Sequence, residues 1–80
     1  MKNTWEKILE YAFMPMHGTM SRKLRKGVTL QINEGRVCDK AVIFLGEEFI
    51  RITENGEGRT VNTYYDWSGI GSIRTESIPE

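Results

Sequence analysis

The amino-acid sequence predicts a mainly β protein with one N-terminal α-helix, folded as a five-stranded, strongly bent, SH3-like small barrel. The first observation is a helical period in the hydrophobic residues over residues 3–14. The second is a change to a period of two after Gly27, which is typical of half-buried strands. The third is a series of glycine-containing turns that divides residues 28–75 into short stretches. Short strands joined by hairpins over so few residues favour a small barrel.

The predicted helix has a single apolar face. Its apolar residues follow the i, i+3, i+4, i+7 spacing and are Trp5, Ile8, Leu9, Ala12 and Phe13. Asn3 can cap the first turn, with Glu6 at the capping-box spacing. Pro15 and Gly18 end the helix. Because a helix of about three turns is not stable alone in water, we expect it to pack on the strands.

A polar connector over residues 18–27 follows the helix, and then the barrel over residues 28–75. The connector holds the densest basic cluster of the chain: Arg22, Lys23, Arg25 and Lys26. The expected strands cover residues 28–32, 36–45, 49–53, 60–67 and 70–75. The turn Asn33–Gly35 has hairpin chemistry, with Gly35 able to adopt a positive φ.

The stretch AVIFL, residues 41–45, is apolar on both faces. Val42 and Phe44 therefore point away from the side that the other three residues fill. A barrel has one inside, so the outward pair needs a second cover. We expect the N-terminal helix to supply it, and a neighbouring subunit is the alternative.

Composition bounds the class of protein. Eighty residues make one domain, 1–80, and a domain of this size buries a thin core. Eleven basic and eleven acidic residues give no net charge, which argues against binding that depends on phosphate contacts alone. A single cysteine forms no internal disulfide, and no apolar run is long enough for a signal peptide or a membrane span. We expect a cytoplasmic protein with no membrane partner.

Three stretches resemble the Sm-like family, which includes the bacterial RNA chaperone Hfq. VTLQINEGRV is similar to the family's first hairpin, and KAVIFLGEEFIRI is similar to its second and third strands. YDWSGIGSI resembles the closing signature of its last two strands. The resemblance covers residues 4–76 and implies a helix followed by five bent strands, assembly into a ring and binding of RNA.

The chain departs from the family at both loops that bind RNA. Where the family has an Asp and an Asn that bind uridine, this chain has Leu45 and Phe49, and the acidic residues 47–48 between them would repel phosphate. Where the family has Arg-Gly or Lys-His, this chain has Ser-Gly at 68–69.

Candidate RNA-binding residues are therefore few. The basic cluster offers cations to a nucleic-acid backbone, or it is a solvated connector. Phe49 lies where a base stacks in the resembled family, and its alternative role is packing at the start of a strand. The RNA-binding candidates are Arg22, Lys23, Arg25, Lys26 and Phe49.

Aromatic and apolar residues near the C-terminus are candidates for a subunit interface. Tyr65 and Trp67 share a side with Val61, so we expect them in the core or at its rim, whereas Tyr64 points the other way and could pack on a neighbour or stack on a base. The interface candidates are Tyr64, Tyr65, Trp67, Ile70 and Ile73.

Catalysis and metal binding are not expected from His17 and Cys38, which are single residues of their types with no oxyanion turn beside them. The sequence therefore predicts a non-catalytic Sm-like protein without cofactor or metal, which forms a homo-oligomeric ring and binds single-stranded RNA. The alternative is a small β-barrel module that binds a protein partner and no nucleic acid.

Overall fold

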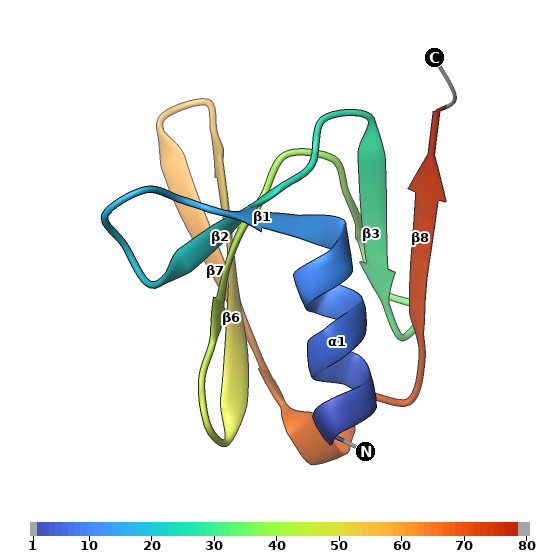
Figure 1. Ribbon diagram of the computed structural model, residues 1–80. Coiled ribbons are helices and arrows are strands. Elements are labelled where there is room, and N and C mark those ends of the chain that lie inside the picture. The colour runs from blue at the N-terminus through green and yellow to red at the C-terminus, as the bar shows by residue number, and fades with distance from the viewer. Residues whose placement is uncertain (1, 79–80) are drawn as a thin grey trace.

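The computed structural model describes residues 2–78, which form one N-terminal helix and a mainly β body (Figure 1). The elements are α1 (Lys2–Ala12), β1 (Phe13–Pro15), β2 (Ser21–Leu24), β3 (Val28–Ile32), β4 (Val37–Cys38), β5 (Val42–Leu45), β6 (Phe49–Gly56), β7 (Arg59–Asp66), the 3-10 helix η1 (Trp67–Gly69) and β8 (Ile73–Ser77). The predicted mainly β class with an N-terminal helix is confirmed. The five-stranded small barrel is wrong, because the described residues form eight strands in two sheets that do not close into a barrel.

The two sheets share two bent stretches of chain. One sheet has the order β1-β2-β5-β6-β7 and the other has the order β4-β3-β8. β2 pairs antiparallel with β5, and β3 pairs antiparallel with β4. Residues 21–32 and residues 37–45 therefore run side by side through both sheets, each with a bend between its two strands. Gly27, with φ of +79°, lies in the first bend, where a side chain would strain the backbone.

The first hairpin replaces part of the expected helix and part of the expected connector. Helix α1 ends at Ala12, two residues before the predicted end, because the backbone N–H and the Nε of Arg25 donate to the carbonyls of Ala12 and Tyr11 at 3.0 and 2.8 Å. The chain then continues as β1, which pairs with β2 inside the expected connector. The basic cluster thus lies partly on a strand.

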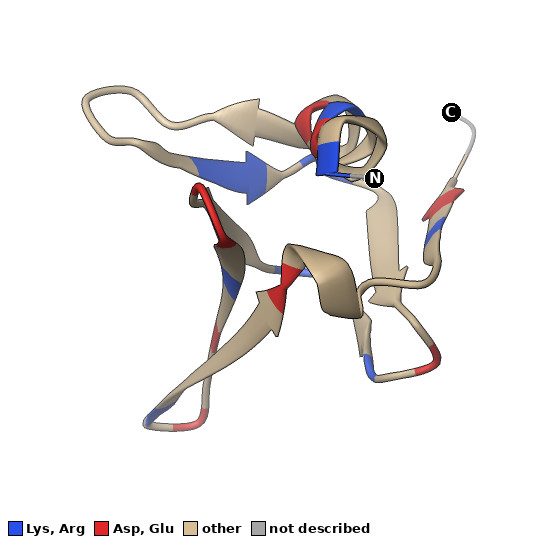
Figure 2. Cartoon of the chain, turned by 90° about the horizontal axis from the view of Figure 1, so that it is seen from below, with Lys and Arg blue, Asp and Glu red and all other residues tan. Residues whose placement is uncertain are grey.

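The hydrophobic core lies between the two sheets and beneath α1, which both Figure 1 and Figure 2 place between them. Its buried members are Leu9, Ala12, Phe13, Leu24, Leu30, Ile32, Cys38, Ala41, Ile43, Ile50, Ile52, Trp67 and Ile70. Because the two sheets do not close into a barrel, the strands leave part of the core uncovered, and α1 covers it.

The expectation that α1 covers Val42 and Phe44 is wrong. Ile43 is fully buried on the side of the core and of α1, so its two neighbours in β5 point to the opposite face of the sheet. There they are half-buried beside residues of β2 and β6, opposite Lys23 and Arg51 in the register. The apolar pair therefore belongs to the outer surface of the five-stranded sheet.

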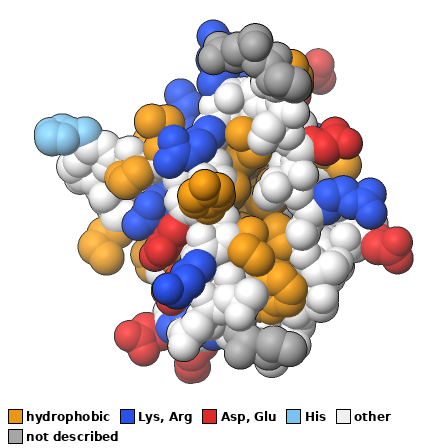
Figure 3. All heavy atoms as spheres, turned by 45° about the vertical axis from the view of Figure 1, so that its right-hand side comes forward, with side chains coloured by type: hydrophobic (Ala, Val, Ile, Leu, Met, Phe, Trp, Pro, Cys, Tyr) orange, Lys and Arg blue, Asp and Glu red, His pale blue; other side chains and the backbone are white. Residues whose placement is uncertain are grey.

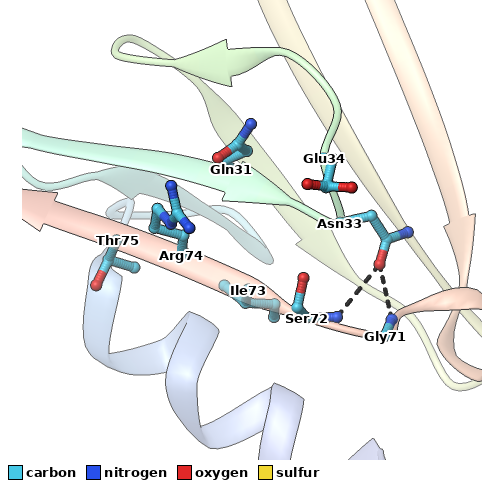
Figure 4. A pocket seen from close by; sticks show the side chains of 8 residues that line it. All are labelled: Gln31, Asn33, Glu34, Gly71, Ser72, Ile73, Arg74 and Thr75. Atoms are coloured by element: carbon cyan, nitrogen blue, oxygen red, sulfur yellow. Dashed lines mark hydrogen bonds between the residues drawn. The ribbon is translucent and has the colours of Figure 1, made fainter.

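Asn33 joins the turn that follows β3 to the segment that precedes β8 (Figure 4). Its Oδ1 accepts from the backbone N–H groups of Gly71 and Ser72 at 2.7 and 3.2 Å, and its Nδ2 donates to the Gly69 carbonyl at 3.1 Å. Asn33 adopts φ of 57°, whereas Gly35, which was expected to have a positive φ, does not. Asparagine tolerates this conformation, so one side chain both permits the turn and holds the segment before β8.

Candidate nucleic-acid interface

One face of the five-stranded sheet is turned away from the core. Its residues alternate with the buried ones along each strand. We call this the outer face; its residues are Met14, Ser21, Lys23, Val42, Phe44, Phe49, Arg51, Thr53, Asn62, Tyr64 and Asp66. Phe49 and Tyr64 are 41 % and 60 % exposed, which is unusual for large aromatic side chains in a chain of this size.

Three aromatic rings and one guanidinium form a continuous group on the outer face. The ring centroids of Phe44 and Phe49 are 6.1 Å apart, and those of Phe49 and Tyr64 are 6.0 Å apart. The Cζ of Arg51 lies 5.4 Å from the centroid of the Phe44 ring. In the register, Arg51 is opposite both Phe44 and Tyr64. We call these four residues the aromatic–arginine group.

Arg51 is held in place by these neighbours. The cation lies over the negative face of the Phe44 ring, which is a favourable arrangement. Its Nε is buried and has no hydrogen-bond partner among the described residues. A buried donor without a partner is costly.

A groove with three lysines opens on the same side of the sheet, between the first hairpin and the bend before β5. It is lined by Met14, Lys23, Leu24, Lys26, Gly27, Asp39, Lys40, Ala41, Val42, Thr53 and Asn55. We call it the lysine groove. Lys23 and Val42 are register partners, and Val42 precedes the aromatic–arginine group by two residues on β5. The groove and the aromatic–arginine group are therefore neighbours on one surface.

The structure brings together some of the predicted RNA-binding residues and separates others. Lys23, Lys26 and Phe49 lie on the outer face or in the lysine groove. Arg22 is opposite Ile43 in the register, on the other face of β2. Arg25 hydrogen-bonds the C-terminal turn of α1, so its side chain has a structural role.

The predicted interface residues divide in the same way. Trp67 and Ile70 are 5 % and 6 % exposed and belong to the core of a single chain. Tyr65 and Ile73 are half-buried and pack against that core. Tyr64 is exposed, and it lies on the outer face rather than beside the other four.

The turn between β5 and β6 and the 3-10 helix η1 meet at one end of the molecule, and both lie beside acidic residues. The indole N–H of Trp67 donates to the Gly46 carbonyl at 3.0 Å, which joins η1 to the turn between β5 and β6. In Figure 2 the ribbon is red, which marks acidic residues, at that turn and at the end of β7. Asp66 accepts from the hydroxyl and the backbone N–H of Ser68, and these hydrogen bonds lower the pKa of its carboxyl. A charged carboxylate here disfavours phosphate.

Cys38 is a free thiol buried in the core. Burial, with a contribution from nearby Glu54, raises the pKa of the Cys38 thiol to about 11, so it stays protonated at neutral pH. Glu54 is 3.4 Å from Arg36, measured from Oε2 to Nε. Burial also raises the pKa of Tyr65. Residues 2–78 contain no group of three or more His, Cys, Asp or Glu side chains placed to hold a metal ion.

Arg51 and Lys40 were missed by the sequence reasoning. The signal for Arg51 was present, since it stands between Ile50 and Ile52 and period-two alternation puts it on the opposite face. Lys40 had no local signal, because its place beside Lys23 depends on the pairing of β2 with β5.

Comparisons with protein-family models, with curated proteins and with solved structures give no match for this chain. Among the described residues, no helix has both the length and the apolar character needed to cross a membrane.

Proposed function

We propose that the chain is a non-catalytic protein that binds single-stranded RNA on its outer face. The observation that carries the proposal is the aromatic–arginine group on the exposed face of the sheet. Its neighbouring ring centroids are 6.0 and 6.1 Å apart, and the Arg51 Cζ lies 5.4 Å from the centroid of the Phe44 ring. Nothing in the chemistry of Cys38 or His17 competes with a binding role.

Stacking on this group supplies the contact with the bases. Exposed aromatic side chains on a sheet take unpaired bases, because every base has a flat π-face. Tyr64 and Phe49 offer the most exposed rings, and Arg51 adds a planar cation beside them. This arrangement accepts bases with little dependence on their identity.

The lysine groove supplies the contact with the backbone. Lys23, Lys26 and Lys40 stand on one surface with a single carboxylate, Asp39, among the lining residues. A strand that lies along β5 can therefore place its phosphates at the lysines and its bases at the rings. The zero net charge of the whole chain does not weaken this, because contacts are made with the local patch.

The test is a fluorescence-anisotropy titration of labelled single-stranded RNA at several salt concentrations. Tyr64→Ala should weaken binding by about five- to 150-fold, because one base loses its stack. A triple variant, with alanine in place of Lys23, Lys26 and Lys40, should make the negative slope of log K against log salt less steep by about 2.

Matched controls come from residues of the same type on another surface. Tyr11 is 85 % exposed on α1, and Tyr11→Ala should leave RNA affinity unchanged. Lys7→Ala removes an exposed charge from the same helix and should also have no effect. Equal losses in Tyr11→Ala and Tyr64→Ala, or no binding by the natural chain at low salt, would contradict the proposal. A protein partner that depends on Tyr64 but not on the lysines would favour the protein-binding alternative.

We further propose that copies of the chain assemble edge to edge into a ring, as the Sm-like resemblance implies. β7 and β8 each lie at an open edge of their sheet, and most of their residues are exposed. The edge strand β1 is only three residues long and ends at Pro15, so it is protected against pairing. β7 and β8 carry no proline and suit pairing between copies.

Light scattering on a sizing column tests the assembly separately from RNA binding. The natural chain should form a single oligomer of defined size, and Val61→Lys on the β7 edge should reduce it to a monomer. Val37→Lys, at an exposed valine outside β7 and β8, is the control and should leave the oligomer intact. A monomeric natural chain would exclude the ring while leaving the RNA titration to be judged by itself.

A further inference from the structure

A groove lies between helix α1 and β8, which is an edge strand of the three-stranded sheet. Its apolar lining includes Ile8, Val28 and Ile73, which are half-buried, so apolar surface is open to solvent there. We call it the helix–strand groove. It shares no residue with the outer face or the lysine groove. Figure 3 shows this side of the molecule, with hydrophobic side chains in its middle and Lys and Arg side chains beside them.

The backbone of β8 is paired on one side alone. β8 pairs with β3, and no strand of the described chain lies at its other edge. The Ser72 carbonyl accepts from the Asn33 N–H at 2.7 Å, and the Ile78 N–H donates to the Gly27 carbonyl at 3.0 Å. Because hydrogen-bonded pairs alternate along an antiparallel ladder, the even-numbered residues of this segment bond to β3. Residues 73, 75 and 77 therefore turn their N–H and C=O groups to the free edge.

The residues with free backbone groups are also those whose side chains line the groove. Ile73 is opposite Ile32 and Thr75 is opposite Leu30 in the register with β3, and both partners are buried. This face of the sheet is therefore turned toward the core and α1. Figure 4 shows Arg74 on the other side of the sheet from Thr75. A strand that paired with the free edge of β8 would place alternate side chains in the helix–strand groove.

The charged side chains that line the groove are both cations, Lys7 and Arg25. Neither forms an ion pair within residues 2–78. The Nε of Arg25 donates to the Tyr11 carbonyl at 2.8 Å, which holds the guanidinium at the C-terminal end of α1. That bond uses the Nε alone, so the Nη groups remain to pair with a carboxylate. An occupant with carboxylates is therefore favoured over a basic one.

We propose that the helix–strand groove binds an extended acidic segment of a partner protein, which adds to the free edge of β8 as a further strand. Main-chain hydrogen bonds to residues 73, 75 and 77 supply the affinity, and the alternate side chains supply the specificity. Hydrophobic side chains of the segment pack on the apolar lining. Its carboxylates pair with Lys7 and Arg25.

This site goes beyond the RNA-binding surface, and it competes with the ring for one edge. β8 is one of the two edges proposed to join copies of the chain, so a bound segment and a neighbouring copy exclude each other there. The full chain with Val61→Lys is altered on β7 and keeps β8 free, so it is the protein for the test. Failure of the ring therefore leaves the groove testable, and failure of the groove leaves the ring intact.

The probe is a labelled peptide of about nine residues, which is within the usual length of a strand. Valine or isoleucine alternates with threonine, and glutamate stands at both ends. The control peptide has lysine in place of the glutamates and should bind about tenfold more weakly in a fluorescence-anisotropy titration. No binding of the glutamate peptide, or equal binding of the two peptides, would overturn the proposal.

Hydrogen exchange, followed by NMR, locates the bound peptide. In the free protein the N–H groups of Arg74 and Glu76 should be protected by β3, and those of Thr75 and Ser77 should exchange rapidly. The glutamate peptide should slow exchange at Thr75 and Ser77. Binding that leaves exchange at these two residues unchanged would place the peptide elsewhere and contradict pairing with β8.

One pair of protein variants tests the charge of the groove. Lys7→Glu should remove most of the preference for the glutamate peptide, because it replaces a lining cation by a carboxylate. Arg59→Glu makes the same change at an exposed arginine outside the groove and should leave the preference as it was. Equal effects of the two substitutions would mean that net charge, and not the groove, selects the peptide.

Two N-methylated forms of the glutamate peptide test the pairing itself. In a paired strand, alternate N–H groups point toward β8 and the others point away. N-methylation of one alternate set should therefore abolish binding, whereas N-methylation of the other set should be tolerated. If both forms bind as well as the unmodified peptide, the peptide does not add to β8 as a strand.

Discussion

The two faces of the five-stranded sheet differ in what their side chains contribute, although they are built from alternate residues of the same strands. On β6, Ile50 and Ile52 are at most 2 % exposed and face the core. Phe49 and Arg51, their immediate neighbours, face outward into the aromatic–arginine group. The inner face determines the fold, and the outer face carries chemistry that the fold does not need.

The largest expected effect is a difference in the free energy of unfolding between variants at two neighbouring residues of β6, one on each face of the sheet. Ile50→Ala leaves a cavity at a fully buried position and should lower the free energy of unfolding by about 2–5 kcal/mol. Phe49→Ala, one residue away on the outer face, should cost less than about 1 kcal/mol. Urea unfolding measures both, and equal losses would mean that the outer face is part of the core.

A smaller effect is expected at high pH from Cys38, a core residue on β4 of the three-stranded sheet. Its folded-state pKa of about 11 is above the ordinary thiol value, so the protonated thiol stabilises the fold below pH 9. This contribution is lost as the pH rises from 9 towards 11 and should be less than about 3 kcal/mol. Chemical unfolding at pH 8 and at pH 10.5 should show a steeper decline for the natural chain than for Cys38→Ala. Identical declines in the two proteins would contradict a stabilising role for the protonated Cys38 thiol.

The smallest of the three effects concerns the polar hydrogen bonds of Asn33, outside the core. Asn33→Gly keeps the positive φ but removes three side-chain hydrogen bonds, and it should cost about 1–2 kcal/mol. Hydrogen exchange should quicken at Gly71 and Ser72, whose N–H groups lose their acceptor. RNA affinity should not change, because Asn33 follows β3 of the three-stranded sheet and is not part of the outer face. A change in affinity would mean that the two regions are coupled.

Much of the fold could be predicted from the sequence, and the failures have physical causes. Period-two alternation identified β3, β6 and β7, because each buries only one face. It counted the bent stretch 37–45 as one strand, since no glycine or proline marks the bend at Asp39 and Lys40. The hairpin of β1 and β2 was missed because neither FMP nor SRKL alternates, and their pairing is fixed by Arg25 and the end of α1.

The candidate site was predicted only in part for a related reason. Phe49, Tyr64 and the lysines at 23 and 26 could be named from residue type alone. Their arrangement on one surface depends on the register of β2, β5, β6 and β7, which no local pattern encodes. The apolar sequence signature around Trp67 and Ile70 was misleading because it specifies core packing.

Photo-crosslinking to a single-stranded RNA that carries 4-thiouridine tests the division between the two faces most directly. The account predicts that the crosslinked residues, located by fragmentation of the peptides, are Phe44, Phe49 and Tyr64 themselves. Crosslinks confined to the turn 46–48 and to residues 68–69, at the acidic end of the molecule, would contradict it.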